Sequence, residues 1–217
     1  MQEMIDTRLV LLEGPPGSGK TTMSKKLFDR ISVSNKCLVQ ESTHPHPIAE
    51  NDFVDDMDVW QVRTLRNLKE LFAETDSDQK LWIMEFAWFQ NTIGLMLLND
   101  CRRDQIMEVC REIEHTIKYL SPVLIRYTAN NAATFVRETY DLRDDGWSEK
   151  MDGLIENWQY GKKRNLTGFD GFLDFYGEYL SIANALYDEL EIDRISIDVA
   201  KRDWPEVEKQ TYEFLQV

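Results

Sequence analysis

Nine residues near the N-terminus read Gly14-Pro15-Pro16-Gly17-Ser18-Gly19-Lys20-Thr21-Thr22. The apolar, β-type run at 9–12 precedes them and an amphipathic helical pattern follows, which is the context of a phosphate-binding loop between a strand and a helix. The three glycines allow successive backbone amides to point at phosphate oxygens, and the N-terminal end of the next helix adds partial positive charge. All nine residues are therefore predicted to bind the phosphates of a nucleoside triphosphate.

Two side chains of this loop carry the predicted chemistry. Lys20 is expected to reach the β- and γ-phosphates of ATP, and the Thr21 hydroxyl is expected to bind the Mg²⁺ ion that bridges them. Thr22 is expected to support the loop. The alternative is a glycine-rich turn that only opens a helix, but such a turn has no need of Lys-Thr at this spacing. ATP and Mg²⁺ are therefore the predicted cofactors.

Composition limits the partners. The chain has 217 residues, enough for one substantial α/β domain, and its 25 Lys and Arg against 39 Asp and Glu give a formal net charge of −14. This charge repels nucleic acid and anionic membranes, whereas local basic clusters can still hold a small anionic substrate. The three cysteines have no Cys-x-x-Cys spacing, which argues against a disulfide framework and a zinc site.

The N-terminus lacks the basic and then apolar order of a signal peptide. The one long apolar region, 81–98, is interrupted by Glu85, Gln90 and Asn91 and fails as a membrane span. We therefore expect a cytoplasmic protein without a membrane partner.

Short apolar runs alternate with longer segments of helical periodicity, which is typical of a parallel sheet with helices on both faces. One predicted helical stripe comprises Val59, Val62, Leu65, Leu68 and Phe72, and we assign it to the core. Residues 141–171 are charged and glycine-punctuated, and we interpret them as part of a mobile lid. The predicted strands are 8–13, 36–41, 81–86, 123–128 and 194–199.

Ligands of such sheets bind beyond the carboxyl ends of the strands. Glu85 ends the third predicted strand, where a carboxylate can hold a magnesium-bound water or accept the proton of an attacking hydroxyl. The alternative is a strand-end acid paired with a lysine. Glu85 is thus predicted to be a catalytic residue or a metal ligand, together with Thr21.

The second predicted strand ends at Glu41, and the loop that follows, with His44 before Pro45 and His46 before Pro47, lies on the same edge of the sheet. Glu41 and His44 are predicted to contact an acceptor, and a plain surface loop is an equal alternative. A metal site here lacks a clear third and fourth ligand.

Basic residues mark the lid. Arg137 and Arg143 are predicted to stabilise a transferring phosphoryl group, because arginines on a closing lid neutralise its charge and exclude water. Lys163, within the basic run 162–164, is predicted to contact substrate. The alternative for each is a solvated helix face.

The phosphate-binding loop, the single acid after the third strand and the arginine-bearing segment after the fourth resemble nucleoside and nucleotide kinases of the P-loop class, with a thymidylate-kinase-like layout. The resemblance implies a three-layer α/β fold, a five-stranded parallel sheet of order 2-3-1-4-5 and a helical lid at about 137–171 within a single domain, 1–217. Thymidylate kinases carry Asp-Arg-Tyr, and deoxynucleoside kinases Glu-Arg-Ser, where this chain has Glu85-Phe86-Ala87. The aromatic and amide side chains that follow, including Trp88 and Gln90, are suited to a neutral or cationic acceptor, although helix packing explains Trp88 and Phe89 equally well.

Two functions are therefore considered. The first is a small-molecule kinase that transfers the γ-phosphoryl group of Mg-ATP to a nucleotide, nucleoside or other hydroxyl compound. The second is a P-loop NTPase that acts as a hydrolysis-driven switch with a protein partner. The periodic segments 58–72 and 105–120 also offer a possible homodimer face.

Overall fold

A computed structural model describes residues 6–48, 56–73, 80–143 and 145–217 and shows one mixed α/β unit. Its sheet is parallel, with the order β2-β3-β1-β4-β5, which confirms the predicted topology. The strands are β1 (Leu9–Glu13), β2 (Lys36–Val39), β3 (Leu81–Glu85), β4 (Val123–Thr128) and β5 (Asp193–Asp198). The helices are α1 (Lys20–Arg30), α2 (Met57–Ala73), α3 (Leu95–Leu98), α4 (Arg103–Ile117), α5 (Ala132–Leu142), α6 (Asp145–Asn157), α7 (Gln159–Arg164), α8 (Gly168–Glu189) and α9 (Trp204–Leu215), with a π-helix η1 (Phe89–Gly94) and a 3-10 turn η2 (Lys118–Leu120).

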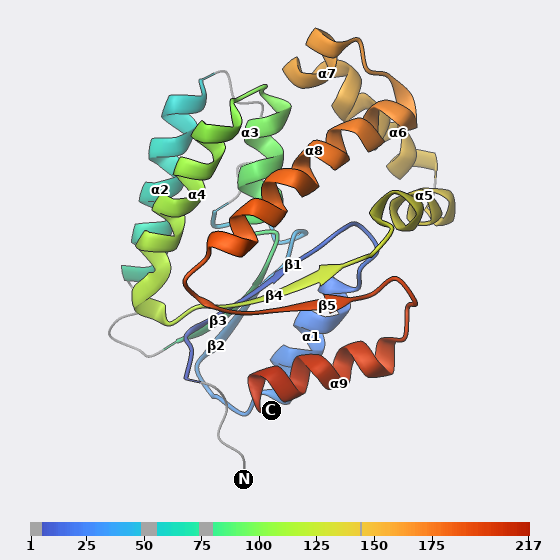
Figure 1. Cartoon of the computed structure of the whole chain (residues 1–217). Helices are drawn as coiled ribbons and strands as arrows, with labels where there is room; N and C mark the ends of the chain where they lie inside the picture. The colour runs from blue at the N-terminus through green and yellow to red at the C-terminus, as the bar shows by residue number, and fades with distance from the viewer. Residues whose placement is uncertain (1–5, 49–55, 74–79, 144) are drawn as a thin grey trace.

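The helices cover both faces of the sheet. Figure 1 shows α1 and α9 below it and α2, α4 and α8 above it. Alternate residues of each central strand enter different cores: Val10 and Leu12 pack with α1 and α9, and Leu9 and Leu11 pack with α2, α4 and α8. This alternation makes the three-layer architecture that the sequence predicts.

The second strand is shorter than predicted, ending at Val39 and not at residue 41. The Gln40 amide donates to the Thr43 hydroxyl (2.8 Å) and the Thr43 amide donates to the Gln40 carbonyl (2.9 Å). These bonds form a turn, and the turn removes Gln40 and Glu41 from the sheet.

The predicted stripe of α2 is wrong at its first two positions. Val59 and Val62 are exposed, and the buried side chains are Trp60, Thr64, Leu68 and Phe72. Because the large Trp60 ring is buried, the helix turns the residues spaced four apart from Trp60 to Phe72 towards the core.

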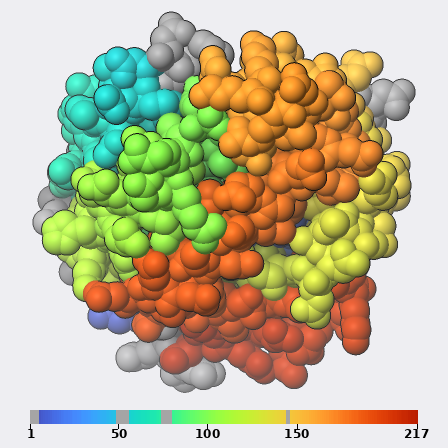
Figure 2. Space-filling model, turned by 45° about the horizontal axis from the view of Figure 1, so that its top comes forward, coloured from blue at the N-terminus to red at the C-terminus, as the bar shows by residue number. Residues whose placement is uncertain are grey.

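Residues 137–171, the predicted lid, begin within α5 and end in the first turn of α8, and the described residues between them form α6 and α7. The helix α6 packs along α8. In Figure 2 the orange residues of α8 lie between the green residues of α3 and α4 and the yellow residues of α5. None of the described helices has both the length and the hydropathy that a membrane-spanning helix needs.

Candidate phosphate-binding site

The loop between β1 and α1 has the tight backbone that its glycines predict. Gly17 and Gly19 have φ of 76° and 82°, in the left-handed region that favours glycine. A Cβ at Gly17 would lie 2.6 Å from the Thr139 hydroxyl of α5, and one at Gly19 would lie 3.1 Å from the Trp204 ring at the start of α9. The loop therefore has no room for larger residues at these positions, and its amides are held at the N-terminus of α1.

Lys20 folds back across this loop. Its ammonium group donates to the carbonyl oxygens of Gly14 (2.9 Å) and Pro15 (3.1 Å), and the residue is 6% exposed. Burial lowers the pKa of Lys20, whereas the nearby carboxylates of Glu41, Glu13 and Glu85 act to raise that pKa. The lysine thus lies within electrostatic range of all three acids.

Glu85, the last residue of β3, contacts the residue that follows Lys20. The Thr21 hydroxyl donates to both of its carboxylate oxygens, at 2.9 and 3.0 Å, and the Glu41 amide donates to Oε1 at 3.2 Å. Glu85 is 1% exposed, and burial raises its pKa against the effect of these hydrogen bonds. The structure therefore brings together Thr21 and Glu85, the two predicted metal ligands.

The loop after β2 reaches the same place. The Gln40 side-chain amide donates to the Thr21 carbonyl (3.0 Å) and the Ser24 hydroxyl (2.9 Å) of α1, which fixes the loop against the helix. The Glu41 and His44 side chains are exposed in this loop. In the described part of the chain, no three His, Cys, Asp or Glu side chains form a group that suits a metal ion.

The predicted lid residues lie in different surroundings. Arg143 is near enough to Lys20 to lower the pKa of that lysine. The Arg137 guanidinium pairs with Asp170 (3.1 Å) and lies over the Phe169 ring. Lys163 pairs with Asp100 (2.7 Å), and Arg164 pairs with the same carboxylate. Arg143 therefore lies within electrostatic range of Lys20, with its guanidinium 5.5 Å from the Trp147 ring centre. The other two predicted residues are held in exposed ion pairs.

Trp88 and Gln90 follow β3. Trp88 is fully buried and meets Phe89 edge to face, which favours the packing alternative for both rings. Gln90 is half-buried, and it is the second residue of η1. Its role in substrate binding stays a prediction.

Glu13 was not singled out from the sequence. This last residue of β1 is 1% exposed, and its carboxylate accepts the amides of Trp88 (2.9 Å), Phe89 (3.0 Å) and Gln90 (3.3 Å). Burial raises its pKa to about 7, although these amides and the Lys20 charge act to lower that pKa. The one sequence signal is a carboxylate that ends an apolar strand directly before Gly14.

Arg126 was missed as well. It lies inside β4 beside Glu13 in the strand register, it is 6% exposed, and it donates to the Asn184 side chain of α8 (2.6 Å). With Gly14, Pro15, Phe89, Tyr176 and Tyr179 it lines a cavity of about 210 Å³. The signal was one arginine in an otherwise apolar strand, Val-Leu-Ile-Arg-Tyr-Thr.

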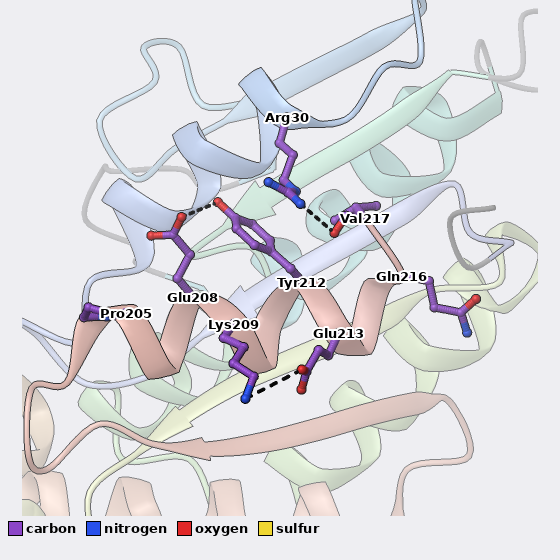
Figure 3. A pocket seen from close by; sticks show the side chains of 8 residues that line it. All are labelled: Arg30, Pro205, Glu208, Lys209, Tyr212, Glu213, Gln216 and Val217. Atoms are coloured by element: carbon purple, nitrogen blue, oxygen red, sulfur yellow. Dashed lines mark hydrogen bonds and ion pairs between the residues drawn. The ribbon is translucent and has the colours of Figure 1, made fainter. Parts of the chain in front are cut away.

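A larger hollow of about 580 Å³ lies elsewhere, between the C-terminal end of α1 and the length of α9. Figure 3 shows that its charged groups bind one another: Arg30 donates to the Val217 carbonyl, Tyr212 donates to Glu208, and Lys209 pairs with Glu213. This hollow is open and lies away from the carboxyl ends of the strands, so we do not assign the site to it.

No protein-family model and no curated protein sequence matches the chain. Solved structures do. A thymidylate kinase from Candida albicans is 15% identical, with 97% of this chain and 92% of that chain covered and a TM-score of 0.58. The YorR protein from Bacillus subtilis, solved with phosphorylated GDP, is 16% identical, with 96% and 95% covered and a TM-score of 0.51. A deoxyadenosine kinase from M. mycoides, solved with dATP, is 10% identical, with 96% and 99% covered and a TM-score of 0.53. The chain therefore has the fold of the P-loop nucleoside and nucleotide kinases.

Proposed function

We propose that this protein is an ATP-dependent phosphotransferase that moves the γ-phosphoryl group of Mg-ATP to a small-molecule acceptor. The observation that carries the proposal is the contact between Thr21 and Glu85 at the N-terminus of α1, with Lys20 buried beside it. A phosphate loop, a hydroxyl for a metal ion and a buried acid at the end of the neighbouring strand are the parts that phosphoryl transfer from Mg-ATP needs.

The residues present fit this cofactor. The left-handed glycines of the loop leave room for phosphate oxygens against backbone amides, and the buried ammonium of Lys20 supplies a positive charge beside them. When it is bound, Mg²⁺ neutralises charge on the phosphates. The Thr21 hydroxyl and the Glu85 carboxylate are the proposed metal-binding groups, because their oxygens lie 2.9 and 3.0 Å apart at the loop.

On the acceptor side, Glu85 has two proposed roles, orienting the metal ion and accepting the proton of the attacking hydroxyl. Its raised pKa suits the second role, because a general base works best when its pKa is close to the ambient pH. Glu41, His44 and Gln90 are the proposed acceptor contacts around it. Arg143 is proposed to stabilise the charge of the transferring group, and its place near Lys20 supports this role more strongly than the ion-paired position of Arg137 does.

The test is ADP release from Mg-ATP, measured with and without a panel of nucleoside monophosphates, nucleosides, sugars and aminoglycosides. We expect one acceptor class to raise the rate well above basal hydrolysis, and we expect Lys20→Ala to abolish the increase. Lys25→Ala, which removes an exposed lysine of the same helix, is the matched control and should leave the rate unchanged. Equal turnover with and without acceptors would contradict the proposal and favour a hydrolysis-driven switch with a protein partner.

A further inference from the structure

Arg126 is a buried cation without an ion-pair partner among the described residues. Its polar side-chain contact is the uncharged Asn184, and its guanidinium lies 6.0 Å from the Phe89 ring centre and 5.3 Å from that of Tyr187. Burial lowers its pKa. The charge of Asp188 acts to raise that pKa, but among the described residues it forms no ion pair with Arg126. A buried charge without an ion-pair partner is costly, so its presence inside a strand calls for a compensating function.

Glu13 does not supply the missing charge. It stands opposite Arg126 in the β1–β4 register, but its carboxylate accepts three amides at the start of η1. Glu13 and Arg126 form no ion pair, and the three amides hold the Glu13 oxygens in place. The guanidinium is therefore available to an anion that enters from the cavity.

The cavity offers a second polar group. Tyr176 of α8 is buried, lines the cavity and has a hydroxyl without a hydrogen-bond partner in the described structure. Buried hydroxyls are almost always hydrogen-bonded, so this one indicates a partner that the protein itself does not provide. Arg126 of β4 and Tyr176 of α8 thus line the same cavity.

The position of the cavity connects it with the phosphate loop, because Gly14 and Pro15 form part of its wall. Its volume of about 210 Å³ corresponds to about seven water molecules at ~30 Å³ each, below the ~300–1,000 Å³ of sites for drug-sized ligands. It therefore suits the charged end of a small molecule and not the whole of a large one.

We propose that this cavity is an anion-binding subsite in which the Arg126 guanidinium and the Tyr176 hydroxyl bind the phosphoryl or carboxylate group of the acceptor. The inference rests on the proposed function for the identity of the ligand as an acceptor. The inference also reverses the sequence-based expectation of a neutral or cationic acceptor. Glu85-Phe86-Ala87 after β3 lacks an arginine, and Arg126 of β4 supplies the positive charge instead.

Calorimetric binding without ATP tests the subsite directly. The probes are thymidine 5′-monophosphate against thymidine, benzoate against benzamide, and inorganic phosphate. The two pairs differ in charge, and together they distinguish a phosphoryl group from a carboxylate. We expect at least one anionic probe to bind tenfold or more tightly than its neutral partner, and we expect Arg126→Gln to remove that difference.

Arg194→Gln is the matched control. Arg194 lies 5.2 Å from the same Tyr187 ring, but it donates to backbone carbonyls and does not line the cavity. This variant should bind the probes as the wild type does. Tyr176→Phe, which removes only the hydroxyl, should weaken anion binding severalfold and provides the test if Arg126→Gln does not fold.

All titrations are repeated in a Lys20→Ala background, because the phosphate loop itself attracts anions and this substitution removes its cation. Anion binding that persists there and depends on Arg126 supports the subsite, even if no acceptor is ever phosphorylated. Equal binding of charged and neutral probes, unchanged discrimination in Arg126→Gln, or no binding of any anionic probe to the wild type overturns it. Phosphorylation of a neutral acceptor that is insensitive to Arg126→Gln also overturns it and leaves the proposed function intact.

Discussion

Replacement of Glu13 by glutamine should change how the stability of this protein depends on pH. Burial raises the pKa of Glu13 from the ordinary value of 4.5 to about 7. Each tenfold change in proton affinity is worth about 1.4 kcal/mol, so this pKa difference corresponds to about 3 kcal/mol in the free energy of unfolding. Because the folded pKa is the higher one, the contribution to stability is fully present below pH 4.5 and is lost as the pH rises through 7.

The Glu13→Gln variant keeps most of the local structure. Its carbonyl oxygen can accept the amides of Trp88 and Phe89, which both bind Oε1, and only the longer bond from Gln90 to Oε2 is lost. The side chain of the variant stays neutral at every pH. Relative to the wild type, the variant should therefore gain about 3 kcal/mol in the free energy of unfolding between pH 4.5 and pH 8.

Urea denaturation at several pH values in this window measures the effect. Contributions from Glu85 and Lys20 are present in both proteins and largely cancel in the difference. Glu70→Gln, which changes an exposed carboxylate paired with Arg66 on α2, is the control and should alter stability by less than about 0.5 kcal/mol at any pH. If the curves of wild type and Glu13→Gln run parallel, burial does not raise the pKa of Glu13 and the reasoning is refuted.

Three further predictions concern the loop and the lid. Gly17→Ala should destabilise the protein by about 1–3 kcal/mol and abolish ATP binding, because its Cβ would meet Thr139 at 2.6 Å. Thermal unfolding measures the loss of stability. The control is Gly177→Ala, whose Cβ meets nothing within 4 Å and which should be neutral or slightly stabilising. Thr21→Val should raise the Mg²⁺ concentration needed for half-maximal turnover about tenfold or more. Thr21→Ser should not, because it keeps the hydroxyl that contacts Glu85. An unchanged Mg²⁺ dependence in Thr21→Val would count against a metal site there. Arg143→Gln should lower turnover about 10²–10³-fold and Arg137→Gln clearly less, since Arg143 is the one near Lys20; steady-state kinetics with equal losses would contradict this ranking.

The sequence was sufficient to place the parts of the candidate site whose residues are local. The loop at residues 14–22 carries its own backbone requirement in its glycines, and an apolar run that ends in Glu85 predicts a strand whose last carboxylate reaches the sheet edge. The contact between Thr21 and Glu85 follows from the parallel pairing of β1 with β3, which the resemblance to known kinases implied.

Glu13 and Arg126 could not be predicted in the same way, because their environment comes from distant parts of the chain. The amides that bind Glu13 lie 75 residues or more downstream, and the Asn184 that contacts Arg126 lies 58 residues away on α8. Periodicity assigns both residues to strands but does not show that Glu13 meets the amides at the start of η1 or that Arg126 meets α8. The end of β2 was misplaced for a different, local reason, since the turn at Gln40 depends on the hydroxyl of Thr43, three residues further on.

The central claim is phosphoryl transfer at the phosphate-binding loop, and the most direct measurement follows the γ-phosphoryl group itself. Mg-ATP labelled at the γ-phosphorus is incubated with the protein and with the acceptor panel, and the products are separated. The account predicts label in a new phosphorylated compound with the wild type and none with Lys20→Ala. Label found entirely as inorganic phosphate, at the same rate with and without acceptors, would contradict it.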